Sequence, residues 1–82
     1  MLITLTIRQN NMESFDIQVP SNQCIHNTLQ ILYENRFLCL NPDEQKYRVS
    51  SWRMGKLLNG EISYEENAVF TADILDVSDW EE

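Results

Sequence analysis

Residues 15–37, FDIQVPSNQCIHNTLQILYENRF, decide the fold, because one sequence pattern gives way to another within this stretch. In FDIQV apolar and polar residues alternate, which is typical of a strand with one buried face. Pro20 ends this strand, and Ser21 or Asn22 can accept a hydrogen bond from an amide in the first turn of a helix. In CIHNTLQILYENRF apolar residues recur at helical spacing, which predicts an amphipathic helix of about four turns.

The residues that precede this stretch predict a partner strand. MLITLTI also alternates, with Ile3, Leu5 and Ile7 on one side, and Asn10-Asn11 suits the turn between the two strands. Because a hairpin is only marginally stable alone, we expect the helix to lie across its apolar face.

The C-terminal half predicts three more strands, of which the first is ambiguous. YRVSSWRM (residues 47–54) places Val49 and Ser51 on one face and Trp52 on the other, and its periodicity does not decide which face is buried. KLL predicts a short strand after Gly55, and DILDV predicts a final strand. The expected core consists of Ile3, Leu5, Ile7, Phe15, Ile17, Val19, Ile25, Leu29, Leu32, Leu58, Tyr64, Val69, Leu75 and Val77.

Composition limits the possible partners and surroundings. The 82 residues fit one domain, which we expect over residues 1–77, followed by an acidic tail at 78–82. The net charge of −7 and the lack of a basic cluster argue against nucleic acid and anionic membrane as partners. No apolar run is long enough to span a bilayer. With two cysteines and no secretion signal pattern, the sequence favours a cytoplasmic protein.

The sequence predicts no catalytic, metal or cofactor site. Cys24 and His26 are two positions apart on the expected helix and therefore point to nearly opposite sides. We expect a half-buried thiol and a solvated imidazole rather than a zinc site or a catalytic base. The glycines are isolated, so no phosphate-binding loop is predicted. These observations favour a protein that is not an enzyme and needs no cofactor.

The order of elements resembles ubiquitin-like β-grasp domains, which are α+β folds with a mixed four- or five-stranded sheet packed on one helix. FDIQVP leading into the helix, then GKLLNGE, then ADILDV resemble the YukD/EsaB family of small bacterial ubiquitin-like proteins, which are associated with type VII (Ess/Yuk) secretion in Gram-positive bacteria. Two positions depart from that pattern. Ala72 stands where the family often has Gly, so the turn must avoid a positive φ or accept strain. Ser51 stands where an apolar inward residue is expected.

The resemblance implies a function based on binding. It implies a non-catalytic accessory protein of a type VII secretion system that docks on a protein of the membrane complex, either a channel component or an FtsK/SpoIIIE-type ATPase. Its location would be cytoplasmic, and a protein partner could hold it at the inner face of the membrane. The alternative is a soluble regulator of the expression or stability of secretion components. The end of the chain, SDWEE, lacks the Gly-Gly that conjugated ubiquitin-like proteins expose, so we expect no conjugation through the C-terminus.

The expected contact surface is the outer face of the sheet. If Leu75 and Val77 are buried, Ile74 faces outward, and Trp52 joins it if Val49 and Ser51 are buried. Core and surface positions for Trp52 both remain open at this point. The expected partner-binding residues are Trp52 and Ile74, a cationic rim of Arg48, Arg53 and Lys56, and the exposed Phe70.

Overall fold

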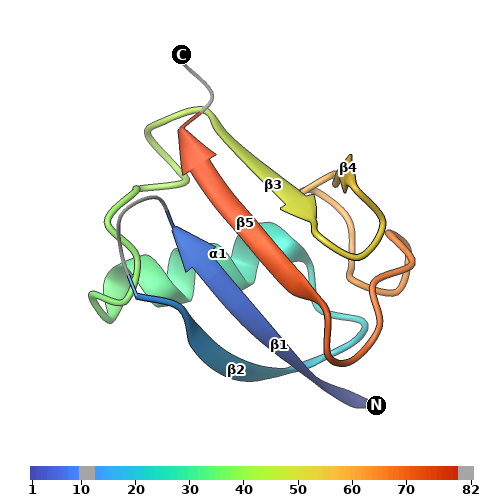
Figure 1. Ribbon diagram of the computed structural model, residues 1–82. Helices are drawn as coiled ribbons and strands as arrows, with labels where there is room; N and C mark the ends of the chain where they lie inside the picture. The colour runs from blue at the N-terminus through green and yellow to red at the C-terminus, as the bar shows by residue number, and fades with distance from the viewer. Residues whose placement is uncertain (10–12, 80–82) are drawn as a thin grey trace.

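A five-stranded sheet curves around a single helix in the computed structural model, which describes residues 1–9 and 13–79 (Figure 1). The strands and the helix are β1 (Leu2–Gln9), β2 (Phe15–Pro20), α1 (Ile25–Glu34), β3 (Tyr47–Ser51), β4 (Lys56–Leu57) and β5 (Ile74–Asp79). The strand order in the sheet is β2-β1-β5-β3-β4. The predicted α+β architecture, a mixed sheet packed on one helix, is therefore confirmed.

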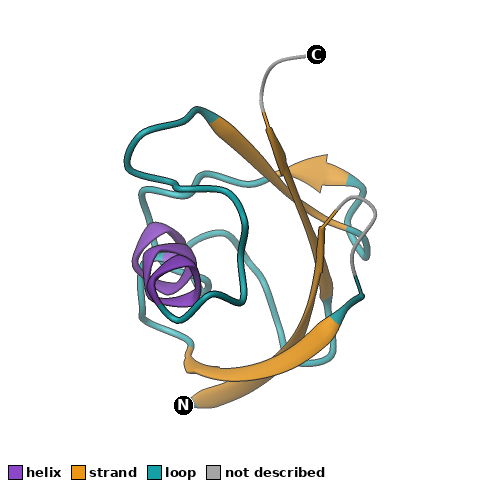
Figure 2. Ribbon diagram, turned by 90° about the vertical axis from the view of Figure 1, so that its left-hand side faces the viewer, coloured by secondary structure: helices purple, strands orange, loops and turns teal. Residues whose placement is uncertain are grey.

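The central pairing joins the two ends of the chain. β1 pairs with β2 in the antiparallel register that opposes Ile3 to Val19 and Leu5 to Ile17, and it pairs with β5 in parallel. β5 in turn is antiparallel to β3. Figure 2 shows the two layers, with α1 on one side of the curved sheet and the other side of the sheet facing away from it. The fold thus has an inner face toward α1 and an outer face without a covering layer in the described part of the chain.

The core lies between α1 and the inner face. Of the fourteen residues that the sequence predicts for it, eleven are buried, and Phe15, Ile17 and Leu58 are partly buried against them. The sequence analysis did not include Leu38, Leu40 and Val49, which are buried as well. Leu38 and Leu40 follow the helix in an irregular segment, where no periodicity marks the inward positions. Gln9 holds this segment, because its side chain bonds Phe37 O at 3.0 Å and Cys39 N at 3.1 Å.

The helix is shorter than predicted at its C-terminal end. It stops at Glu34, and Arg36 takes a positive φ of 68°. The amide of Phe37 donates to Leu32 O at 2.9 Å and that of Arg36 to Tyr33 O at 3.0 Å. This pair of bonds is a Schellman motif, which turns the chain sharply and closes the helix. Phe37 then packs on Phe15, with their ring centroids 5.6 Å apart.

The expected N-terminal cap is wrong. The N-cap residue is Cys24, and neither Ser21 nor Asn22 caps the helix. The first two helical amides donate instead to carbonyls of a distant loop, from Ile25 N to Ile62 O at 3.2 Å and from His26 N to Gly60 O at 2.8 Å. Because a tertiary contact satisfies these amides, no local cap is needed and no local sequence signal marks the start of the helix.

Two expectations fall on residues that the structure does not describe. The turn at Asn10-Asn11 lies there, and so do residues 80–82 of the expected tail. The first two residues of that tail, Ser78 and Asp79, form the end of β5.

Candidate functional site

A buried carboxylate organises the junction between β3 and β5. Asp73 is 1% exposed, and its Oδ2 accepts a hydrogen bond from Ser51 Oγ at 2.6 Å. Its Oδ1 accepts from the amides of Ile74 at 2.7 Å and Arg53 at 3.2 Å, while Ser51 Oγ accepts from the amide of Met54 at 3.0 Å. We call this group of bonds the Ser51–Asp73 clasp. It explains why a polar residue occupies the inward position at Ser51, since its hydroxyl partners the carboxylate.

The clasp settles the position of Trp52. With Val49 and Ser51 both buried, the following residue leaves the core, and Trp52 is 63% exposed. Its amide still donates to Ile74 O at 2.9 Å, which ties it to the first residue of β5. Trp52 is therefore a surface residue. The sequence alone had left both a core and a surface placement open for it.

Several apolar and cationic side chains gather around this junction. Phe70 and Leu57 are each more than half exposed, and the guanidinium carbon of Arg53 lies 5.5 Å from the centroid of the Phe70 ring. Leu57 was not predicted. It lies opposite Ser50 on β3, so it projects from the outer face with Ser50. We define the outer patch as Trp52, Arg53, Leu57, Phe70 and Ile74.

Only part of the predicted cationic rim lies at this junction. Arg53 follows Trp52 and lies over the Phe70 ring, but Lys56 pairs with Ser51, whose side chain is buried, and Arg48 pairs with Ser78 toward the other end of β5. The outer face also carries an ion pair that the sequence analysis missed, in which Arg8 Nε lies 2.7 Å from Asp76 Oδ1 and a second nitrogen 3.0 Å from Oδ2. These hydrogen bonds to Asp76, and its charge, raise the pKa of Arg8. Only the parallel β1–β5 register reveals this pair, and no local pattern encodes that register.

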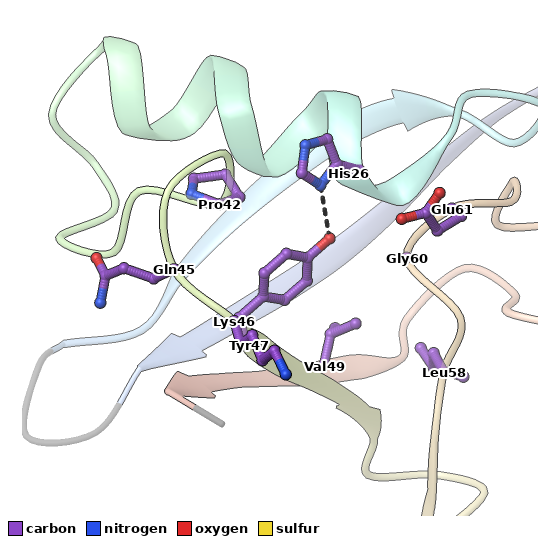
Figure 3. Close-up of a pocket in the computed structure, with 9 residues that line it drawn as sticks. All are labelled: His26, Pro42, Gln45, Lys46, Tyr47, Val49, Leu58, Gly60 and Glu61. Carbon is purple, nitrogen blue, oxygen red and sulfur yellow. Dashed lines mark hydrogen bonds between the residues drawn. The ribbon is translucent and has the colours of Figure 1, made fainter. Parts of the chain in front are cut away.

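A second group of polar side chains lies at the start of α1 (Figure 3). His26 Nδ1 is 2.8 Å from Tyr47 Oη, and His26 Nε2 is 2.8 Å from Asp43 Oδ1. The prediction of a solvated histidine is thus wrong, because the imidazole is partly buried and both nitrogens have partners. With a neutral imidazole, Nε2 donates to Asp43, which can only accept when ionised, and Nδ1 accepts from the phenol. No local pattern indicates this contact, because the three residues come from separate elements of the fold.

His26 and Tyr47 also border a shallow cavity of about 460 Å³. Its wall includes Lys46, Leu58, Gly60 and Glu61. A Cβ atom on Gly60 would lie 2.5 Å from Tyr47 Oη, so the phenol packs against the bare backbone there. Burial, and then the negative charge of Glu61, raise the pKa of Tyr47 to about 12. The phenol therefore stays protonated at neutral pH and has a proton to donate to His26, and the group joins helix, loop and β3.

The thiols are separate from one another and uncrosslinked. Cys24 is half-buried, as predicted, and its Sγ lies 3.1 Å from Gly60 O, whereas Cys39 is exposed. Within residues 1–9 and 13–79, no three His, Cys, Asp or Glu side chains come together as they would for a metal ion. The part of the chain that the structure describes also has no helix long and apolar enough to cross a membrane.

Comparison with solved structures identifies the fold of this chain. No family model and no curated protein matches the sequence. Among solved structures, the ubiquitin-like domain of Dsk2 from Plasmodium falciparum matches with a TM-score of 0.74 and 14% identity, over 96% of this chain and 99% of that one. The C-terminal ubiquitin-like domain of mouse tubulin-specific chaperone e gives 0.71 and 22%, over 99% and 89%. A designed protein based on ubiquitin gives 0.76 and 17%, over 99% and 92%. The chain therefore has the ubiquitin-like β-grasp fold.

Proposed function

We propose that this chain is a non-catalytic accessory protein of a type VII secretion system, which acts by docking through the outer patch on a protein of the secretion machinery. The observation that carries the docking is the exposure of Trp52 next to Arg53, whose guanidinium lies over the exposed Phe70 ring. The secretion context rests on the sequence resemblance to the YukD/EsaB family. The segments that carry this resemblance form β2, β4 and β5, so they include framework positions rather than only surface ones.

The composition of the outer patch supports protein binding. Tryptophan and arginine are the residues that most often dominate binding energy at protein interfaces. Here they occur on a protein of net charge −7, so Arg53 gives the patch a charge opposite in sign to that of the whole molecule. A partner with an apolar pocket bordered by acidic side chains would complement it. We propose a channel component or an FtsK/SpoIIIE-type ATPase of the secretion complex as this partner.

The polar group at α1 supports a non-catalytic role. A histidine between an aspartate and a hydroxyl is the arrangement that activates a nucleophile. Here the hydroxyl belongs to Tyr47, whose pKa is raised to about 12, whereas activation requires a lowered one. The arrangement thus stabilises the neutral phenol and serves to hold the loop.

The test is the recovery of partners from mildly solubilised host membranes by the tagged chain and by a Trp52→Ala, Ile74→Ala double variant. The matched control is Phe37→Ala, which removes an aromatic side chain of similar exposure, 57% against 63% for Trp52, from the segment after α1. We expect the wild-type chain and the control to recover a membrane protein of the secretion complex and the folded double variant to lose it. Recovery of soluble proteins alone would contradict docking on the complex and favour a soluble regulator of secretion components. Equal recovery by the folded double variant would contradict the outer patch.

A further inference from the structure

β2 lies at the edge of the sheet (Figure 1), so one side of its main chain faces away from β1. The amide of Ser21 donates to Met1 O at 2.7 Å, which fixes the phase of the antiparallel ladder. By the alternation of such ladders, Val19 and Ile17 bond to β1, whereas Gln18 and Asp16 direct their amides and carbonyls outward. Thr4, which lies opposite Gln18, confirms this phase. Its carbonyl points away from β2 and accepts a hydrogen bond from Ala72 N at 2.7 Å on the β5 side.

Nothing in the described part of the chain satisfies those outward groups. No main-chain hydrogen bond is made there by Asp16 or Gln18 beyond the β1 pairing. The side chain of Asp16 is engaged on the outer face, where it accepts from Thr6 Oγ1 at 2.7 Å, so it does not fold over the edge. Unpaired strand edges are templates for a further strand.

An apolar groove runs beside the same edge. It has a volume of about 270 Å³ and lies between β2 and α1, lined mainly by Ile17, Val19, Thr28, Ile31 and Leu32. Ile31 is 50% exposed at its rim. A strand that paired with β2 would direct alternate side chains toward this groove, because successive side chains of a strand point to opposite faces. Edge and groove together thus match an extended segment with branched aliphatic residues at every second position.

Charge distinguishes the possible occupants. Between Arg8 and Arg36 the sequence contains no Lys or Arg, whereas it contains Glu13, Asp16 and Glu34. Glu34 follows Ile31 by three residues on α1, so the two are neighbours on the helix surface. A second copy of this chain would bring the same acids and a net charge of −7 to the edge. An extended segment flanked by Lys or Arg would be attracted instead.

We propose that the β2 edge and the β2–α1 groove bind an extended segment of a partner protein, with aliphatic side chains at alternate positions and basic residues beside them. The segment adds a sixth strand to the sheet through Asp16 and Gln18. This surface is separate from the outer patch, which belongs to β3, β4 and the start of β5. The two surfaces have opposite charge, so the chain could hold two partners at once.

The test begins with selection of a phage-displayed library of random linear peptides on the immobilised full chain. We expect the enriched peptides to alternate aliphatic residues and to carry Lys or Arg. The synthetic form of the most enriched peptide should slow hydrogen exchange at the amides of Asp16 and Gln18. Its affinity should fall in high salt, where the Debye length is about 3 Å.

Variants then test the two parts of the surface. Gln18→Pro removes the outward amide at a position that makes no bond to β1, and it should weaken peptide binding at least about tenfold. Gln18→Ala keeps that amide and should bind as the wild type does. Ile31→Gln, which makes the groove polar without adding charge or touching β2, should weaken binding to a similar degree, whereas Trp52→Ala should leave it unchanged.

Three results would overturn the proposal. One is the absence of any enriched peptide, and another is an enriched peptide that binds folded Gln18→Pro and Ile31→Gln as tightly as the wild type. The third is a dimer in sedimentation equilibrium that Gln18→Pro abolishes, which would assign the edge to a second copy. Because Trp52→Ala is neutral here and disruptive in the membrane test, failure of one proposal is distinguishable from failure of the other.

Discussion

Ser51 and Asp73 make up the most demanding polar interaction of the core, because a carboxylate that is 1% exposed must have its charge satisfied by hydrogen bonds. Ser51→Ala would remove the 2.6 Å bond to Oδ2 and leave the two main-chain donors to Oδ1. We expect the free energy of unfolding to fall by about 2 kcal/mol, as measured by urea denaturation. Asp73→Asn and the double variant complete a cycle, in which strictly additive losses would contradict a direct coupling.

Ala72 shows strain at the position where the sequence resemblance led us to expect glycine. Its φ is 73°, a conformation that costs a residue with a Cβ about 1–2 kcal/mol, and its amide must stay there to donate to Thr4 O. Ala72→Gly should therefore raise the free energy of unfolding by about 1 kcal/mol in urea denaturation, the relief being offset in part by glycine's greater freedom when unfolded. Asn22→Gly, at an exposed position without positive φ, should instead lower it. A lower midpoint for Ala72→Gly would show that this turn is not strained.

At the scale of elements, the loop between α1 and β3 depends on the contacts of His26. Tyr47→Phe would remove the donor to Nδ1, so we expect a loss of about 1 kcal/mol in stability. The amides of Glu44 and Gln45, which bond Asn41 O, should exchange hydrogen faster because the loop is held less firmly. Tyr33→Phe is the control, since the Tyr33 hydroxyl has no partner among the described residues. Equal exchange in both variants would contradict the role of His26 as a link.

The elements also show what a sequence can and cannot predict here. β1, β2 and β5 were predicted because their inward residues alternate, as in Leu75 and Val77, and that pattern is local. The N-terminal cap of α1 was not predicted, because the first helical amides donate to the carbonyls of Gly60 and Ile62, which lie far along the chain. The same holds for the candidate site. Trp52 is exposed because Ser51 is buried against Asp73. The alternation of YRVSSWRM alone fits burial of either face, so it does not predict this exposure.

At the scale of the whole molecule, the packing of helix against sheet buries two phenols, and this predicts how stability depends on alkaline pH. Burial raises the pKa of Tyr64 to about 12, and burial followed by the charge of Glu61 does the same for Tyr47. In an unfolded chain a tyrosine loses its proton near pH 10. Between about pH 10 and 12 the unfolded state therefore binds fewer protons than the folded state, and stability falls as pH rises. Below pH 10 both states hold these protons, so the tyrosines contribute no slope.

We expect the free energy of unfolding to decrease across that window by up to about 1.4 kcal/mol per pH unit for Tyr64, and by less for Tyr47, whose partial exposure lets solvent screen its surroundings. Urea midpoints at a series of pH values, together with absorbance of the phenolate on titration, measure both quantities. Tyr64→Phe should remove the larger part of the slope and Tyr47→Phe the smaller part, whatever each substitution does to stability at neutral pH. A wild-type slope that both variants retain would mean that other groups govern the alkaline transition, and phenolate formation near pH 10 in the folded chain would mean that neither ring is protected by the core.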